Sequence, residues 1–408
     1  MARRDFTIAV TGLNATDNPG PGVSVIRALR EAPGFRGRLV GLAYDTLDPG
    51  IYARDIGLWG AFLVPYPSQG ADALLERLKY VHERVPLDVI IPTLDSELTA
   101  FIAIQPELKR LGIRMYLPTR EQLDLRSKTR LSELGRKAGI DVPEERVVST
   151  SADLYRIHEE IPYPFMIKGV FYGAKVAHSL DEALLAFHET TARWGVPVIV
   201  QKYHAGEEYD VVAVGDGAGG LVGAVPMKKT FLTDKGKGWA GVAVMDPMLL
   251  EATRRFMEAS RWRGPCELEV LRTQEGRYLL IEVNPRFPAW TYLSAGAGQN
   301  LPWAVARLAL GEAVGPLPEF KPGTMFVRIS IDQIASMEDF ERMATAGELV
   351  RVVGVGPRAP DPFTPGRPSA EAAPRAERAR GRAGSGSGTG GKAGTGTGTV
   401  RSTGRRRR

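Results

Sequence analysis

One stretch of the chain, residues 267–286, limits the possible folds more than any other. It reads Glu-Leu-Glu-Val-Leu, passes through a turn containing Gly276, and continues as Tyr-Leu-Leu-Ile-Glu-Val-Asn-Pro-Arg. Two short apolar runs joined by a turn with glycine predict a β-hairpin. Because alternate residues of a strand share a face, we expect Glu282 and Asn284 to point the same way, with Glu269 on the partner strand.

The oxygen side chains of this hairpin suit a hard cation. Mg²⁺ prefers carboxylates, keeps some waters and usually takes its remaining ligands from substrate phosphates. We therefore predict that Glu269, Glu282 and Asn284 bind Mg²⁺ or Mn²⁺. Arg286 adds a planar cation suited to phosphate or carboxylate. An ordinary surface hairpin also carries solvated acids, but it does not explain a Glu-x-Asn-Pro-Arg run.

The run that ends in Arg286, with Glu269 upstream at a matching spacing, resembles the metal-binding end of the ATP-grasp superfamily. The similarity is to its carbamoyl-phosphate-synthetase-like and carboxylate–amine ligase branch, and it covers roughly residues 1–320. The resemblance implies an α/β chain, with α+β architecture in the ATP domain. The expected parts are a Rossmann-like domain (1–118), an ATP-grasp domain (119–318), a small C-terminal appendage (319–355) and a disordered basic tail (356–408).

The N-terminal part has a Rossmann-like pattern of its own. Residues 6–10 form a β-rich run, and a glycine-containing loop and a helical periodicity follow. The chain has no Gly-x-Gly-x-x-Gly at this point, so a dinucleotide is not expected. Ligands of open α/β sheets collect beyond the carboxyl ends of the strands. Asp45 could thus bind a hydroxyl or amine, while Asp95 and Glu97 either face substrate or cap the next helix.

The resemblance also implies which residues bind ATP. The phosphate-contacting lysines would be Lys128 and Lys168, the adenine hinge would hold Gln201, Lys202 and His204, and Glu208 would bind the ribose. Gln201 replaces an acid of the family, but its amide oxygen can still accept a hydrogen bond from an exocyclic amine. Lys168 ends an apolar strand, where an unpaired ammonium is costly. Its position alone therefore indicates an anionic partner for the lysine.

Two cations are predicted to act on the reacting groups. By the resemblance, Lys229 would contact the transferred phosphate and Arg286 the acyl phosphate or the carboxylate. The loop that follows Lys168 departs from the glycine-rich pattern of the family, because it carries Phe171 and Tyr172.

These residues favour an ADP-forming ligase that needs ATP and Mg²⁺. It would activate a carboxylate as an acyl phosphate and couple it to an amine of an amino acid, small molecule or peptide. One alternative is phosphorylation of bicarbonate or carbamate, as in biotin carboxylase or carbamoyl-phosphate synthetase. Another is a nucleotide-binding scaffold whose tail docks on nucleic acid or an acidic partner. Three hard ligands argue against a scaffold, since binding alone does not need them.

The positive charge of the chain belongs to its C-terminal end. Residues 356–408 hold 12 Lys and Arg and three acids, whereas the first 355 residues hold 41 basic and 44 acidic residues. The body is therefore not a basic fold built around nucleic acid. The Gly-, Ser-, Pro- and Arg-rich tail is expected to be disordered. Its four final arginines either tether the protein to an anionic partner, or the tail is an extension that has no partner.

The remaining expectations concern location and assembly. The single cysteine, Cys266, cannot form an intrachain disulfide, and no apolar run reaches transmembrane length. The N-terminus has no signal-peptide core. We therefore expect a cytoplasmic protein with no membrane partner, and a homodimer is left open.

Overall fold

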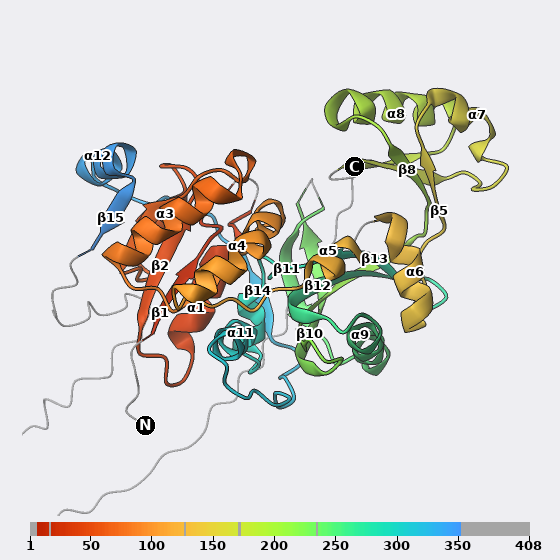
Figure 1. Cartoon of the computed structure of the whole chain (residues 1–408). Coiled ribbons are helices and arrows are strands. Elements are labelled where there is room, and N and C mark those ends of the chain that lie inside the picture. Colours follow the sequence, from red (N-terminus) through yellow and green to blue (C-terminus); the bar gives the residue numbers. More distant parts are fainter. Residues whose placement is uncertain (1–5, 16–17, 126–127, 170–172, 234–235, 352–408) are drawn as a thin grey trace, which may run out of the picture. The chain divides into compact units, whose positions relative to one another are not determined.

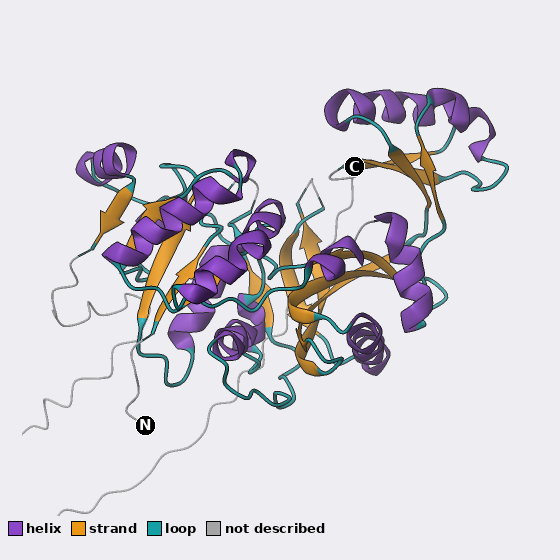
Figure 2. Ribbon diagram, viewed as in Figure 1, coloured by secondary structure: helices purple, strands orange, loops and turns teal. Residues whose placement is uncertain are grey.

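The computed structural model describes residues 6–15, 18–125, 128–169, 173–233 and 236–351, except the side chains of residues 128 and 129 (Figures 1 and 2). The chain divides into two units, residues 1–354 and 355–408. Every described residue belongs to the first unit. The predicted tail, residues 356–408, lies outside the described residues. The mixed α/β class predicted from the sequence is confirmed.

The first sheet consists mainly of parallel strands (Figure 2). Its order is β15-β3-β2-β1-β4, and only β15 runs antiparallel to its neighbour within the described residues. The strands are β1 (Thr7–Val10), β2 (Arg38–Ala43), β3 (Gly60–Leu63), β4 (Val89–Ile91) and β15 (Glu348–Val350). The helices are α1 (Pro21–Glu31), α2 (Pro49–Tyr52), α3 (Ala71–Arg84), α4 (Leu98–Arg110) and α12 (Met337–Ala346). β1 and β4 are buried throughout, which explains their unbroken apolar runs.

The loop after β1 allows α1 to begin close to the sheet. Gly12 has a φ of 71°, in the left-handed region that glycine enters without strain. A Cβ on Gly22 would lie 1.9 Å from the carbonyl oxygen of Thr11, so a larger residue would push the helix away. The loop therefore opens α1 at the carboxyl edge of the strands, where ligands of such sheets bind.

The second sheet has six strands in the order β13-β12-β9-β10-β11-β14, and all its pairs are antiparallel. The strands are β9 (Gly206–Asp216), β10 (Leu221–Leu232), β11 (Gly238–Ala243), β12 (Arg263–Thr273), β13 (Tyr278–Asn284) and β14 (Met325–Val327). The helices of this part are α5 (Arg120–Leu125), α6 (Lys128–Ala138), α9 (Pro247–Ser260), α10 (Tyr292–Gly296) and α11 (Leu301–Ala309). Phe256 of α9 and Trp262 are fully buried against the sheet, and each such side chain contributes about 1.5–3 kcal/mol or more. This core fixes the strands on which the site is built.

The third sheet is smaller and has the order β5-β8-β6-β7. Its strands are β5 (Glu145–Val148), β6 (Phe165–Gly169), β7 (Ala174–Ala177) and β8 (Val198–Lys202), and the helices are α7 (Leu154–Ile157) and α8 (Leu180–Trp194). α8 buries Ala183, Ala186 and Phe187 together with Phe165 and Ile167 of β6. One face of this sheet is thereby covered by its own helix. Lys168 and Gln201 lie on neighbouring strands of it.

Residues 319–351, which the sequence suggested as a separate appendage, add one strand to each of the two larger sheets. β14 pairs with β11, and β15 pairs with β3. Each strand is only three residues long. No helix among the described residues has the length and apolar character to cross a membrane.

Candidate active site

The β12–β13 hairpin predicted from the sequence is present and brings its polar residues onto one face. Its register sets Glu269 opposite Glu282, and Glu267 opposite Asn284. Directly opposed residues of an antiparallel pair have Cβ atoms about 4.5–5.5 Å apart on the same face. Asn284 Nδ2 donates to Glu269 Oε1 at 2.8 Å. The amide oxygen of Asn284 is therefore left as the free acceptor of its side chain toward a ligand.

The donor set formed by Glu269, Glu282 and Asn284 fits a hard divalent cation. Two carboxylates stand opposite each other across the hairpin, and a divalent cation bound there would offset the repulsion between their like charges. Two carboxylates plus a neutral oxygen leave room for the waters and phosphate oxygens that Mg²⁺ keeps. Among the described residues, His, Cys, Asp and Glu do not form a metal cluster of three by themselves. The amide of Asn284 is thus needed to complete the set.

Glu267 is a buried carboxylate that the sequence did not single out as a functional residue. It is 5% exposed. Its Oε1 accepts from Trp290 Nε1 at 2.7 Å, and its Oε2 accepts from Arg286 Nη1 at 2.8 Å and from Asn284 Nδ2 at 3.1 Å. Both oxygens are therefore occupied by the protein. The signal in the sequence was its spacing of two residues from Glu269, which places both carboxylates on one face.

Arg286 connects the hairpin to the N-terminal sheet. Its Nε donates to Asp95 Oδ2 at 2.9 Å, while its Nη1 contacts Glu267. Burial alone would lower the pKa of Arg286, but the carboxylates of Asp95 and Glu267 raise it above its usual value. The guanidinium is therefore held firmly in its charged form. Two of its nitrogens are already used for contacts within the protein.

Glu97, the second acid of the Asp95 turn, has a structural role. It accepts backbone N–H groups of Thr93 and Leu94 and the hydroxyls of Thr11 and Tyr44. Burial raises its pKa, and these hydrogen bonds act in the opposite direction. Of the two expected roles, the structure shows the helix-capping one for Glu97, whereas Asp95 contacts Arg286. Glu97 holds the ends of β1, β2 and β4 together.

Lys229 lies among carboxylates on the same face as the predicted metal ligands. Its Nζ is 3.0 Å from Glu208 Oε2 and 3.2 Å from Asp210 Oδ1. Burial alone would lower the pKa of Lys229, but Asp210, Glu269 and Glu208 raise it. Asp210 is 3% exposed, and burial raises its pKa despite the attraction of Lys229.

Asp210 is a second residue that the sequence did not identify. It lies opposite Glu269, which in turn lies opposite Glu282. Three carboxylates therefore form a row across three neighbouring strands. The spacing Glu208-x-Asp210 places these two acids on one face, but only the register shows that Asp210 lies next to the predicted metal ligands Glu269 and Glu282.

The predicted nucleotide residues lie on the third sheet and at the start of β9. Lys168 Nζ donates to Gln201 Oε1 at 2.6 Å, and both side chains are buried. Gln201 Nε2 in turn donates to Glu145 Oε2 at 3.3 Å. Lys168 thus fixes the orientation of the amide, because the opposite orientation would turn an NH₂ group toward the ammonium.

Three other predicted nucleotide residues are Lys202, His204 and Lys128. Lys202 ends β8 and His204 follows it, and both are half-buried. Burial lowers the pKa of His204, and the charge of Lys202 lowers it further. The backbone of Lys128 begins α6, but its side chain lies outside the described residues, as do residues 170–172 with Phe171 and Tyr172.

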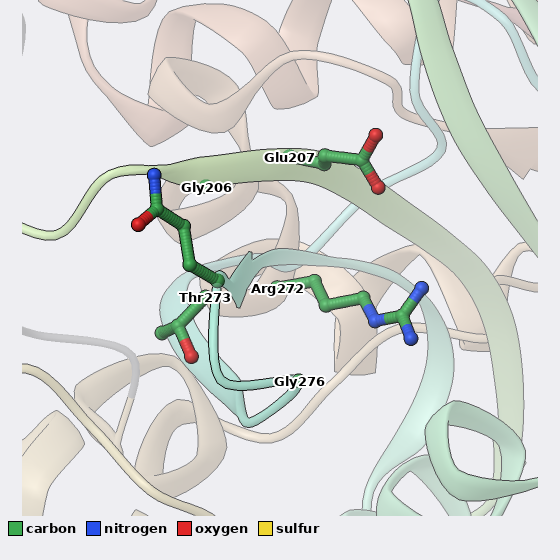
Figure 3. Close-up of a pocket in the computed structure, with 6 residues that line it drawn as sticks. Gly206, Glu207, Arg272, Thr273 and Gly276 are labelled. Atoms are coloured by element: carbon green, nitrogen blue, oxygen red, sulfur yellow. The ribbon is translucent and has the colours of Figure 1, made fainter.

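A hollow of about 330 Å³ lies where the β12–β13 turn approaches the start of β9. Gly206, Glu207, Arg272, Thr273 and Gly276 line it, and Figure 3 shows the Glu207 and Arg272 side chains pointing the same way. Its lining contains none of the predicted site residues. The predicted metal ligands lie instead on the polar face of the second sheet.

Comparison with known proteins gives three kinds of similarity. Residues 195–330 match the family model described as ATP-grasp in the biosynthetic pathway with Ter operon. A D-alanine–D-alanine ligase of Chromohalobacter salexigens is 27% identical over 170 residues, covering 38% of this chain and 54% of that protein. The carbamoyl phosphate synthase large chain of Agathobacter rectalis is 23% identical over 248 residues, covering 56% of this chain and 23% of that protein. The chain thus spans about half or less of the length of these curated relatives.

Solved structures share the fold. A biotin carboxylase from Campylobacter jejuni superposes with a TM-score of 0.62 at 16% identity, covering 78% of this chain and 74% of its own. An L-amino acid ligase from Bacillus licheniformis superposes with a TM-score of 0.56 at 15% identity, covering 76% and 75%. At these identities the likeness concerns the arrangement of strands and helices alone.

Proposed function

This chain belongs to the ATP-grasp superfamily, and on that basis we propose that it is an ADP-forming ligase that joins a carboxylate to an amine. A single observation carries the proposal. Glu269, Glu282 and Asn284 share one sheet face with Lys229, while Arg286 borders them. Oxygen donors and cations in this combination suit the transfer of a phosphoryl group, which needs positioning and charge neutralisation more than covalent help.

The first step would move the γ-phosphoryl group of ATP to the substrate. A carboxylate oxygen attacks the γ-phosphorus, the bond to the bridging oxygen of ADP breaks, and ADP leaves with that electron pair. An amine then attacks the acyl carbon and inorganic phosphate leaves, while the amine gives up a proton. Glu269, Glu282 and Asn284 would hold Mg²⁺ or Mn²⁺, which when bound neutralises phosphate charge.

ATP binding would rearrange the contact between Lys168 and Gln201. In the structure the Gln201 oxygen accepts from the lysine and so is engaged. A phosphate oxygen is a stronger partner for an ammonium than a neutral amide, because both members of the pair are charged. We expect Lys168 to move to the phosphates, together with Lys128. The freed amide oxygen then accepts from the adenine amine, beside Lys202 and His204.

The ribose and the transferred phosphate would share the neighbourhood of Lys229. Glu208 is exposed and lies 3.0 Å from this lysine. If Glu208 turns to the ribose hydroxyls, Lys229 keeps Asp210 as its counter-ion and directs its remaining donors to phosphate. Arg286 would border the acyl phosphate from the other side.

The relatives suggest which substrates to test first. Two of the similar proteins are named as ligases of D-alanine and of L-amino acids, so amino acids come first as carboxylate and as amine. A second candidate is phosphorylation of bicarbonate or carbamate, because a carbamoyl phosphate synthase matches over 56% of the chain.

The test is ADP release with Mg²⁺ and ATP over amino acids, other carboxylates, amines and bicarbonate, each alone and in pairs. We expect ADP release that depends on a carboxylate–amine pair. The variant Glu282→Gln should release no ADP, because the substitution removes a charged metal ligand. Release with bicarbonate alone would favour the second candidate. Nucleotide binding without turnover under every condition would instead favour a nucleotide-binding scaffold. Undiminished turnover by Glu282→Gln would contradict the metal assignment.

A further inference from the structure

Arg328 lies at the end of β14, on the sheet face that carries the proposed site. Its backbone N–H donates to the Trp239 carbonyl at 3.0 Å, which continues the β11–β14 pairing. In the register, Lys229 pairs with Gly241, and Gly241 pairs with Phe326. Because alternate residues share a face, Arg328 projects from the same side as Phe326 and Lys229.

The guanidinium of Arg328 is poorly compensated. Its Nε is buried and has no hydrogen-bond partner within the part of the chain that the structure describes. Its carbon atom Cζ lies 5.5 Å from the ring centroid of Phe326, so an apolar ring covers one side. Burial lowers the pKa of Arg328 to about 10, and the charge of Glu267 opposes this effect. A buried N–H group without a partner is costly, and the cost is greater for a charged group.

The other cations of the site differ from Arg328. Lys229 has two carboxylates within 3.2 Å, and Arg286 donates to two carboxylates. Glu267, whose charge acts on Arg328, already accepts three hydrogen bonds from other residues. Among these three cations, Arg328 is therefore the one for which the described residues provide no ion pair.

We infer that Arg328 binds the carboxylate of the substrate and, after phosphoryl transfer, the acyl phosphate. This inference rests on the proposed function and assigns a specificity-determining residue to it. The planar fork of a guanidinium matches a carboxylate through two parallel hydrogen bonds. Arg286, fixed between Asp95 and Glu267, borders the same group and also joins the hairpin to the N-terminal sheet.

The experiment separates nucleotide binding from acyl-phosphate binding. The probe is acetyl phosphate, titrated calorimetrically into full-length protein saturated with Mg²⁺ and ADP. Wild type should bind both, and Arg328→Gln should bind Mg²⁺–ADP as wild type does but acetyl phosphate at least ten-fold more weakly. The control Arg254→Gln removes an exposed arginine paired with Glu251 and should bind both ligands normally.

A second measurement, urea unfolding, tests whether Arg328 has a structural role instead. Arg328→Met should raise the urea midpoint of the ligand-free protein, because it removes an uncompensated buried charge, whereas an arginine with a structural role would lower it. Absence of Mg²⁺–ADP binding by wild type would contradict the proposed function itself. Binding of Mg²⁺–ADP with no acetyl phosphate binding, or with equal acetyl phosphate affinity in Arg328→Gln, would overturn the assignment of Arg328 alone.

Discussion

Replacing Glu267 by glutamine should destabilise the protein and disturb the metal face together, although Glu267 is not a proposed metal ligand. The carboxylate accepts from Trp290 on one oxygen and from Arg286 and Asn284 on the other. Glutamine keeps the shape but turns one of these positions into an NH₂ donor. In either orientation that group meets an N–H of Trp290 or of Arg286 and Asn284, so at least one donor loses its acceptor.

The size of the effect follows from these contacts. A buried donor without an acceptor costs about 1–3 kcal/mol, and breaking a buried ion pair from one side costs about 3–5 kcal/mol. Arg286 keeps its hydrogen bond to Asp95 Oδ2 at 2.9 Å, so the pair is only half broken. We therefore expect a loss of about 3 kcal/mol in the free energy of unfolding, the lower end of the ion-pair range.

Urea unfolding followed by tryptophan fluorescence measures this loss. The matched control is Glu312→Gln, which removes an exposed carboxylate that contacts Arg307 at 2.7 Å and should change stability by less than about 1 kcal/mol. Glu267→Gln should also weaken the stabilisation that Mg²⁺ gives if its NH₂ group takes the Oε2 position, because Asn284 then loses one of its two fixed acceptors. Equal urea midpoints for Glu267→Gln and Glu312→Gln would refute the central role of this carboxylate.

Two further predictions concern the phosphate lysine and the tail. Lys168→Ala should weaken ATP binding about ten-fold or more, since it removes a charge-assisted contact. The control Lys175→Ala breaks an exposed pair with Glu189 and should leave ATP binding unchanged. Equal ATP affinities of the two variants by calorimetry would leave Lys168 as a structural partner of Gln201. A chain ending at Gly356 should keep its ATP turnover, because the removed residues have a composition that cannot bury a core. Lost turnover would contradict this, and a salt-sensitive pull-down partner lost on truncation would assign the tail a tethering role.

The sequence predicted the hairpin well because its signal is local. Alternation, a glycine turn and two acidic ends all lie within residues 267–286, and the register sets the expected residues opposite each other. Asp210 and Arg328 could not be found in this way. Their significance depends on which strands lie side by side in the second sheet, and pairing between distant strands leaves no mark in a short window of sequence.

The contact between Lys168 and Gln201 illustrates the same limit. The sequence indicated that Lys168 needs a partner and that Gln201 replaces an acid, but not that the two side chains bond to each other across β6 and β8. Gln201, which stands where the family resemblance implies an acid, offers the lysine a neutral acceptor. Only the neighbouring strands reveal this, because the residues are 33 positions apart.

The pairing of β15 with β3 has a consequence for how the chain is made. Four strands of the first sheet are complete by Ile91, but the edge of β3 is closed only by residues 348–350. A ribosome adding 5–20 residues per second needs roughly 13 to 50 s for the intervening stretch. Throughout that time the nascent sheet exposes the backbone of Gly60, Ala61 and Phe62 as an unprotected edge. Shielding by a chaperone is therefore most needed during synthesis of residues 92–347, after the N-terminal strands have already formed.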